Sequence, residues 1–70
     1  MDQVEINLIR NSDGTITINS EGFSRTIWVR SLTPEKKYEA LREAILESGF
    51  VFSEKAEKMA RKIVGFKPNS

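Results

Sequence analysis

The feature that most constrains this sequence is a four-residue turn motif that occurs twice. Residues 11–14 read Asn-Ser-Asp-Gly, and residues 19–22 read Asn-Ser-Glu-Gly. Asn at the first position and Gly at the last suit a tight turn that ends in a left-handed residue. Between the two motifs, Ile16 and Ile18 alternate with threonines, and a period of two is typical of a half-buried strand. The sequence therefore predicts two hairpin turns that join three antiparallel strands.

The flanking segments supply the other two strands. Val4, Ile6 and Leu8 alternate with polar residues and predict a first strand near residues 3–10. The second strand is expected at 15–19. Residues 23–31 contain many β-branched and aromatic side chains, which favour a third strand there.

Two helices are expected after the strands. Thr33 can cap a helix that starts with Pro34, and Gly49 can end it, which predicts a helix over 34–48. Ser53 can cap a second helix over 53–64, whose apolar residues recur with helical spacing. The expected core consists of Ile6, Leu8, Ile18, Ile27, Leu41, Ile45, Met59 and Ile63.

The segment Phe50-Val51-Phe52 has two interpretations, a buried connection between the helices or a short fourth strand at 50–52. We favour the connection. Both interpretations give an α+β fold, a three-stranded antiparallel meander followed by two helices on one face (β-β-β-α-α). A chain of 70 residues makes a single domain, expected at 1–66, with a flexible tail at 67–70.

The chain contains neither cysteine nor histidine. This removes the usual ligands of zinc, haem and iron–sulfur clusters, so we expect no metal and no other cofactor. Ser–His and Cys–His nucleophiles are also impossible, and we expect no enzyme. The missing cysteines favour a cytoplasmic location, in a cell or an infected host. The acidic start is unlike a signal peptide, and no apolar run is long enough to span a membrane.

Acidic and basic blocks alternate along the chain: 1–22 is acidic, 23–42 basic, 43–54 acidic and 55–70 basic. Such blocks can attract a partner, or they can neutralise one another in an antiparallel fold. The second helix carries a basic patch, a secondary candidate contact surface that is also compatible with an ordinary solvated helix face. Its members are Lys55, Lys58, Arg61 and Lys62.

The third strand carries apolar residues on both faces. If Ile27 and Val29 face the helices, Trp28 points outward, because two helices cover only one face of a three-stranded sheet. Alternatively, Trp28 packs over a sheet edge as part of the core. Trp and Arg are enriched at the energetic centres of interfaces. The candidate partner-binding residues are Trp28, Arg30, Arg25 and Thr26.

These features predict a non-enzymatic protein-binding module that occupies a surface of a larger, unidentified protein. Phage and mobile-element genomes encode many domains of this size, so we expect an accessory protein or inhibitor. A monomer or a homodimer is compatible with the sequence, since strand edges can pair across a two-fold axis.

The alternative function is DNA binding, through the basic second helix or through the sheet. A three-stranded sheet followed by a helix, over residues 3–48, resembles the arm-site-binding domains of tyrosine recombinases and plant AP2-type domains in topology. The resemblance implies a sheet laid in the major groove, with Arg25, Trp28 and Arg30 directed at the DNA. No specific motif is shared. Glu5, Asp13 and Glu21 oppose this function because they repel phosphates.

Overall fold

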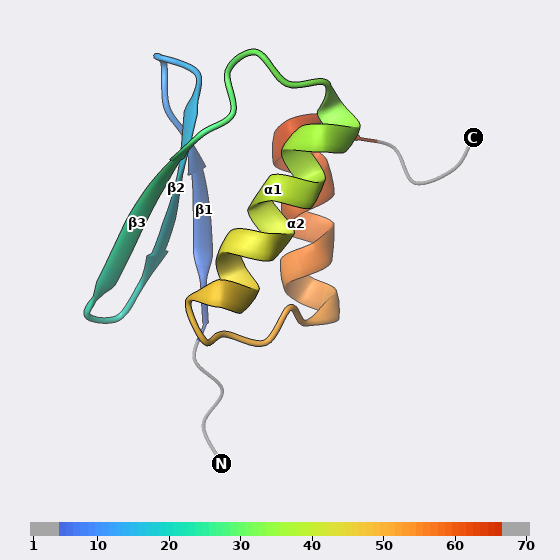
Figure 1. Ribbon diagram of the computed structural model, residues 1–70. Coiled ribbons are helices and arrows are strands. Elements are labelled where there is room, and N and C mark those ends of the chain that lie inside the picture. The colour runs from blue at the N-terminus through green and yellow to red at the C-terminus, as the bar shows by residue number, and fades with distance from the viewer. Residues whose placement is uncertain (1–4, 67–70) are drawn as a thin grey trace.

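The computed structural model describes residues 5–66. Its elements are β1 (Asn7–Arg10), β2 (Thr15–Ser20), β3 (Phe23–Trp28), α1 (Pro34–Glu47) and α2 (Glu54–Val64). This is the predicted α+β order of three strands and two helices (Figure 1). The expected strand at 3–10 begins only at Asn7, and residues 1–4 and the predicted tail at 67–70 lie outside the described residues.

The three strands form an antiparallel sheet in the order β1-β2-β3. The two matched motifs close turns of different length. The first occupies residues 11–14 between the strands, whereas in the second Asn19 and Ser20 still pair with β3, so the turn contains only Glu21 and Gly22. The third strand ends at Trp28, short of the expected residue 31. The cause is a new turn, in which the Leu32 amide donates to the Val29 carbonyl over 3.1 Å.

Both helices begin at the predicted caps. The Thr33 hydroxyl accepts a hydrogen bond from the Lys36 amide, and the Ser53 hydroxyl accepts one from the Ala56 amide, each over 3.2 Å. These bonds satisfy amides that a helix leaves without an internal partner. Neither helix of residues 5–66 has the length and apolar character needed to cross a membrane.

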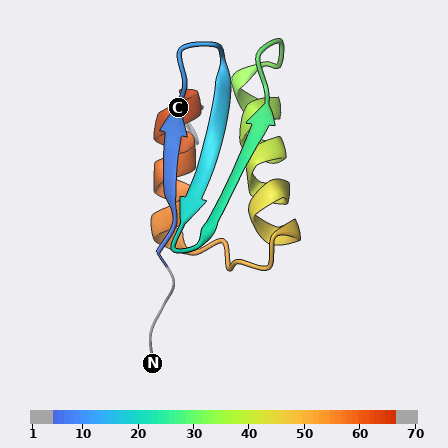
Figure 2. The same ribbon diagram turned by 90° about the vertical axis from the view of Figure 1, so that its left-hand side faces the viewer.

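The fold has two layers, with both helices on the same face of the sheet. Helix α2 packs beneath β1 and beside α1. In Figure 2 the sheet lies in front of the helices, and no helix or strand of residues 5–66 covers its other face. The two-layer arrangement therefore divides the sheet into an inner face and an outer face.

The core lies between the layers. Its largest fully buried side chains are Ile18, Val29, Leu41 and Ile45. The prediction is confirmed for the buried residues Ile6, Ile18, Leu41 and Ile45, and the half-buried Leu8, Ile27 and Ile63 pack against them.

For Met59 the prediction is wrong. This side chain of α2 is half-buried, lines a surface pocket together with Leu8 of β1, and is not part of the core. The buried residues of α2 are Ala56, Ala60 and Val64, which turn Met59 onto the flank of the helix. Ile16 and Val29 are buried core residues that the prediction omitted.

Residues 50–52 form a connection and no strand. Phe50 packs edge-on against Phe23, with ring centroids 5.1 Å apart, and Phe52 packs against Tyr38 at 5.9 Å. Val51 between them is 79% exposed. The connection is therefore anchored by two aromatic rings, but the expectation that it is buried is wrong for its central residue.

Candidate functional site

The outer sheet face is made of side chains that alternate away from the helices. None of its members in the three strands is charged, and most carry a hydroxyl or an amide. They are Asn7, Ile9, Thr15, Thr17, Asn19, Ser24, Thr26 and Trp28. This face is thus a polar, uncharged surface with two large apolar side chains, Ile9 and Trp28, both exposed.

Trp28 dominates this face. Its side chain is 64% exposed, so the alternative in which Trp28 belongs to the core is wrong. It stands at the end of β3, directly opposite Thr15 in the strand register. The guanidinium carbon of Arg30 lies 5.8 Å from the centre of the indole ring, within the range of a cation–π contact.

The first turn leaves space for Arg30. Gly14 has φ +90°, and a Cβ at this position would lie only 2.9 Å from Cγ of Arg30. A larger residue would therefore be strained by its backbone and would also displace the arginine stem. The turn glycine consequently has a second role. Because it carries no side chain, the stem of Arg30 can pass close to the turn and place its guanidinium over Trp28.

A chain of hydrogen bonds organises the side chains beside Trp28. The Asn11 side-chain amide donates to the hydroxyls of Thr15 and Thr17, each over 2.9 Å. The Thr17 hydroxyl in turn lies 3.0 Å from that of Thr26 on β3. These bonds connect the first turn to β2 and β3 and hold Thr15, Thr17 and Thr26 in one arrangement.

Asp13 completes this network at the turn. Its carboxylate accepts hydrogen bonds from the Thr15 hydroxyl at 2.6 Å and from the Thr15 amide at 3.0 Å. The hydroxyl bond, then the amide bond, hold the pKa of Asp13 below its ordinary value, and the charge of Arg30 contributes less. The turn therefore carries a negative charge next to the cation that contacts Trp28.

The structure brings Thr26, Trp28 and Arg30 together at one end of the sheet, but it places Arg25 on the inner face. The Arg25 guanidinium donates to the Ala44 carbonyl at 3.4 Å and to the Ser48 hydroxyl at 3.3 Å, and it lies 3.6 Å from Glu47. Arg25 thus binds the C-terminal end of α1. The strand parity that it shares with Ile27 is the sequence signal for this placement.

The basic patch of α2 does not form one surface. Lys58 is exposed, Lys55 pairs with Glu5 at 3.3 Å, and Lys62 lines a pocket together with Leu8 of β1. Arg61 lies about 100° around the helix from Lys62 but is an i,i+3 neighbour of Lys58. Packing against other segments, rather than helical spacing alone, therefore separates Arg61 from the lysines.

Arg61 packs between the helices. Its guanidinium carbon lies 4.8 Å from the ring centre of Tyr38 and 5.2 Å from that of Phe66. Two of its nitrogens donate to Glu57 at 2.9 and 3.1 Å, whereas Nη1 is buried and has no hydrogen-bond partner among residues 5–66. Arg61 is consequently a packing residue, which sequence reasoning assigned to the solvated face.

Two ion pairs join oppositely charged blocks of the sequence. Arg25 with Glu47 connects the second block to the third, and Lys55 with Glu5 connects the fourth to the first. This arrangement supports the interpretation that the blocks neutralise one another in the fold. Within residues 5–66, no group of three or more acidic side chains lies close enough together to hold a metal ion.

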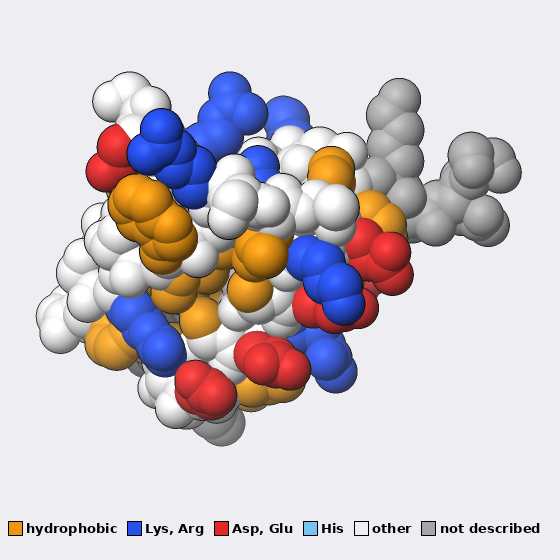
Figure 3. Space-filling model, turned by 45° about the horizontal axis from the view of Figure 1, so that its top comes forward, with side chains coloured by type: hydrophobic (Ala, Val, Ile, Leu, Met, Phe, Trp, Pro, Cys, Tyr) orange, Lys and Arg blue, Asp and Glu red, His pale blue; other side chains and the backbone are white. Residues whose placement is uncertain are grey.

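Lys and Arg side chains nevertheless gather at one end of the molecule, around the β1–β2 turn and the β3–α1 connection (Figure 3). This end includes Arg30 and the exposed ring of Trp28.

No protein-family model matches this sequence, and comparison with curated proteins and with solved structures gives no significant match.

Proposed function

We propose that this chain is a non-enzymatic protein-binding module, whose outer sheet face docks onto a larger partner protein. The observation that carries the proposal is the position of Trp28, the only tryptophan of the chain, 64% exposed on an uncovered sheet face. A small domain gains stability by burying large aromatic side chains. An exposed tryptophan beside an arginine is typical of an interface anchor.

The surroundings of Trp28 suit a protein partner. The ring fits an apolar pocket of the partner, Arg30 can bind a carboxylate at its rim, and exposed polar side chains such as Asn19, Ser24 and Thr26 offer hydrogen bonds. Because the network from Asn11 to Thr26 already orders the threonines beside Trp28, docking there costs little additional conformational entropy. Bound in this way, the domain acts as an accessory protein or inhibitor by blocking the surface that it covers.

The composition of the outer sheet face favours protein over DNA. Binding to DNA depends on cations that neutralise phosphates, and the strand residues of this face are uncharged. Of the three residues that a DNA-binding sheet would use, Arg25 binds α1 instead. Arg30 alone remains beside Trp28.

The test starts with a pulldown from a lysate of the source cells, with and without nuclease. Binding of the captured partner is then compared for the native chain, Trp28→Ala and Lys58→Ala, after circular dichroism has confirmed folding. We expect Trp28→Ala to weaken binding by at least about thirtyfold, roughly 2 kcal/mol, and Lys58→Ala to leave it nearly unchanged. The single tryptophan also provides a direct signal, a blue shift of its fluorescence when the partner covers it.

Two outcomes would contradict the proposal. One is a folded Trp28→Ala variant that binds normally while Lys58→Ala loses binding. The other is capture that disappears after nuclease treatment, which would indicate a nucleic-acid ligand. Should Trp28→Ala unfold, Trp28→Thr, which keeps a β-branched residue on the strand, replaces it in the comparison.

A further inference from the structure

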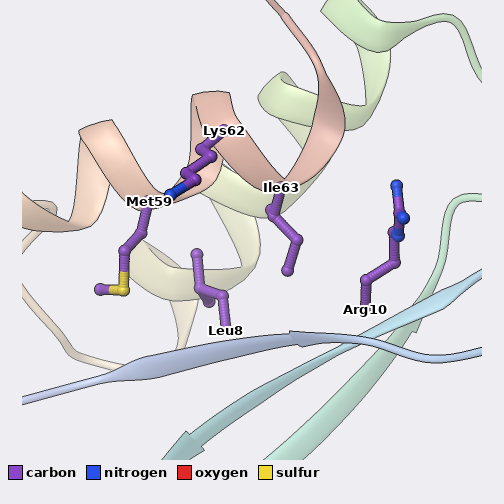
Figure 4. Close-up of a pocket in the computed structure, with 5 residues that line it drawn as sticks. All are labelled: Leu8, Arg10, Met59, Lys62 and Ile63. Carbon is purple, nitrogen blue, oxygen red and sulfur yellow. The ribbon is translucent and has the colours of Figure 1, made fainter.

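A groove runs along the free edge of β1, between this strand and α2. It is a pocket of about 390 Å³, within the range of ligand-binding clefts. At Met59 it adjoins a second pocket of about 530 Å³, whose lining comes mainly from residues 49–56 and includes Glu5 and Glu54. In Figure 4, Leu8 rises from β1 toward Met59 and Ile63 of α2, and Arg10 stands further along the strand. We call the first pocket the edge groove, defined by Leu8, Arg10, Met59, Lys62 and Ile63.

The main chain of β1 is open at the same place. Within residues 5–66, β1 is an edge strand that pairs only with β2. The Asn11 amide donates to the Thr15 carbonyl over 2.9 Å. Because main-chain groups alternate between the two sides of a strand, this bond shows which residues of β1 direct their amides and carbonyls toward β2. The amides and carbonyls of Asn7 and Ile9 therefore point toward β2, whereas those of Leu8 and Arg10 point toward the free edge. An extended segment can add there as a fourth strand.

The side chains of the groove define the chemistry of such a segment. The half-buried Leu8, Met59 and Ile63 form an apolar floor. Arg10 and Lys62 line the same pocket, no acidic residue lines it, and neither cation forms an ion pair with any described residue. An added strand directs every second side chain into the groove. The complementary pattern is an apolar residue with an acidic residue two positions away.

The same features disfavour two other occupants. A second copy of this chain would bring one cationic α2 beside another. Arg10, a charged residue of the edge strand on the inner face of the sheet, also opposes pairing between two copies. A nucleic-acid backbone would satisfy Arg10 and Lys62 but would leave the apolar floor without a partner. A protein segment with alternating apolar and acidic residues matches both the floor and the cations.

We propose that the edge groove binds an extended protein segment with this alternating pattern, by strand addition to β1. The groove lies on the inner side of the sheet, so this site is separate from Trp28 on the outer face. The two sites allow the domain to hold a flexible segment of its partner while the outer sheet face contacts the folded part.

The probe is a fluorescein-labelled peptide of about nine residues, the length of a long strand, with threonine at every second position and leucine alternating with glutamate at the others. This pattern presents both orders of apolar and acidic residue, so it suits either strand direction. In an NMR titration of the whole chain we expect the amides of Leu8, Arg10, Lys62 and Ile63 to shift. The chemical shifts of the Thr26 and Trp28 amides should not change.

Charge reversal tests the chemistry. In a variant with Arg10→Glu and Lys62→Glu, the glutamate peptide should bind at least about tenfold more weakly, and a matched peptide with lysine in place of glutamate should bind better than it does to the native chain. Lys58→Glu, a single charge reversal on the same helix outside the groove, is the matched control for Lys62→Glu. Lys62→Glu alone serves if the double variant does not fold.

N-methylation of the peptide tests strand addition. Methyl groups on alternate amides block one edge of an extended peptide and leave the other edge free. Of the two versions, methylated on the threonines or on the other residues, one should lose binding and the other should keep it. Equal binding by both versions overturns strand addition.

Three further results overturn the proposal. Shifts centred on Thr26 and Trp28 would place the peptide on the outer sheet face. Tighter binding of a short DNA strand to the same residues would indicate a phosphate ligand. A dimer whose Leu8 and Arg10 amides exchange slowly without peptide would assign the edge to a second copy.

Trp28→Ala should leave peptide binding unchanged, which separates this test from that of the outer sheet face.

Discussion

At the scale of single residues, the first turn prepares the surroundings of Trp28. Asn11 holds two threonine hydroxyls of β2, and Asp13 fixes the main chain and side chain of Thr15. Gly14 allows the stem of Arg30 to approach the turn closely. The residues that make the turn therefore also order one end of the outer sheet face.

Asp13 makes the stability of the fold depend on pH. Its pKa is lower in the folded chain than the ordinary 3.8, so the folded state binds this proton less tightly than the unfolded state. The stabilisation is fully present above the unfolded pKa and is lost as the pH falls through the lowered folded pKa. Asp13→Asn should consequently lower the Tm more at about pH 6 than at about pH 2.5. Thermal melts at both pH values measure this difference.

Glu21→Gln provides the control, because it changes a carboxylate in the second turn that forms no side-chain hydrogen bond with the described residues. Its effect on Tm should be small at both pH values. If Asp13→Asn lowers the Tm by the same amount at both pH values, the hydrogen bonds from Thr15 do not favour the ionised carboxylate.

At the scale of elements, α2 presents three faces to three different neighbours. Ala56 and Ala60 are fully buried in the core, where their small side chains allow close packing of α2. Met59 and Ile63 face the edge groove, and Arg61 packs against Tyr38 of α1. The helix thus supports the core, the groove and the junction with α1 at once.

Arg61 should matter more for stability than its charge suggests. Arg61→Ala removes the contacts with two aromatic rings and the pair of hydrogen bonds to Glu57, and we expect a loss of about 1–3 kcal/mol in the free energy of unfolding. Lys58→Ala, an exposed cation on the same helix, should change it by less than about 0.5 kcal/mol. Urea denaturation measures both. Equal losses for the two variants would show that the stacking of Arg61 contributes nothing.

At the scale of the whole molecule, a single interface between two layers carries the stability. The shortest dimension is 18 Å, which leaves room for one sheet and one helix layer. Five residues, Ile16, Ile18, Val29, Leu41 and Ile45, combine large volume with nearly complete burial. A domain of this size has little stability in reserve, so each of these residues matters to the entire fold.

Leu41→Ala should therefore unfold much of the population. Leu41 is fully buried, and its truncation should cost about 2–5 kcal/mol. Leu46→Ala makes the same chemical change on the same helix at a side chain that is 45% exposed, and it should cost less than about 1 kcal/mol. Thermal melts of both variants test this ranking. A Tm for Leu41→Ala within a degree or two of the native value would contradict the central position of this residue.

Local sequence signals predicted the elements well because they act over a few residues. The turn motifs, the caps Thr33 and Ser53 and the apolar periods locate three strands and two helices to within a few residues of their observed limits. They could not show that the third strand stops at Trp28, because a turn at 29–32 replaces its last residues.

The sequence by itself determined the α+β order and the alternation that places Trp28 and Thr26 on one face of β3. Only the tertiary structure decided what surrounds each face. The helices cover the side that carries Arg25, Arg61 packs against Tyr38 on a different helix, and Lys62 of α2 lines the edge groove together with Leu8 of β1. The physical reason is distance along the chain. Periodicity and capping depend on near neighbours, whereas the environment of a side chain depends on packing between segments that are far apart in the sequence.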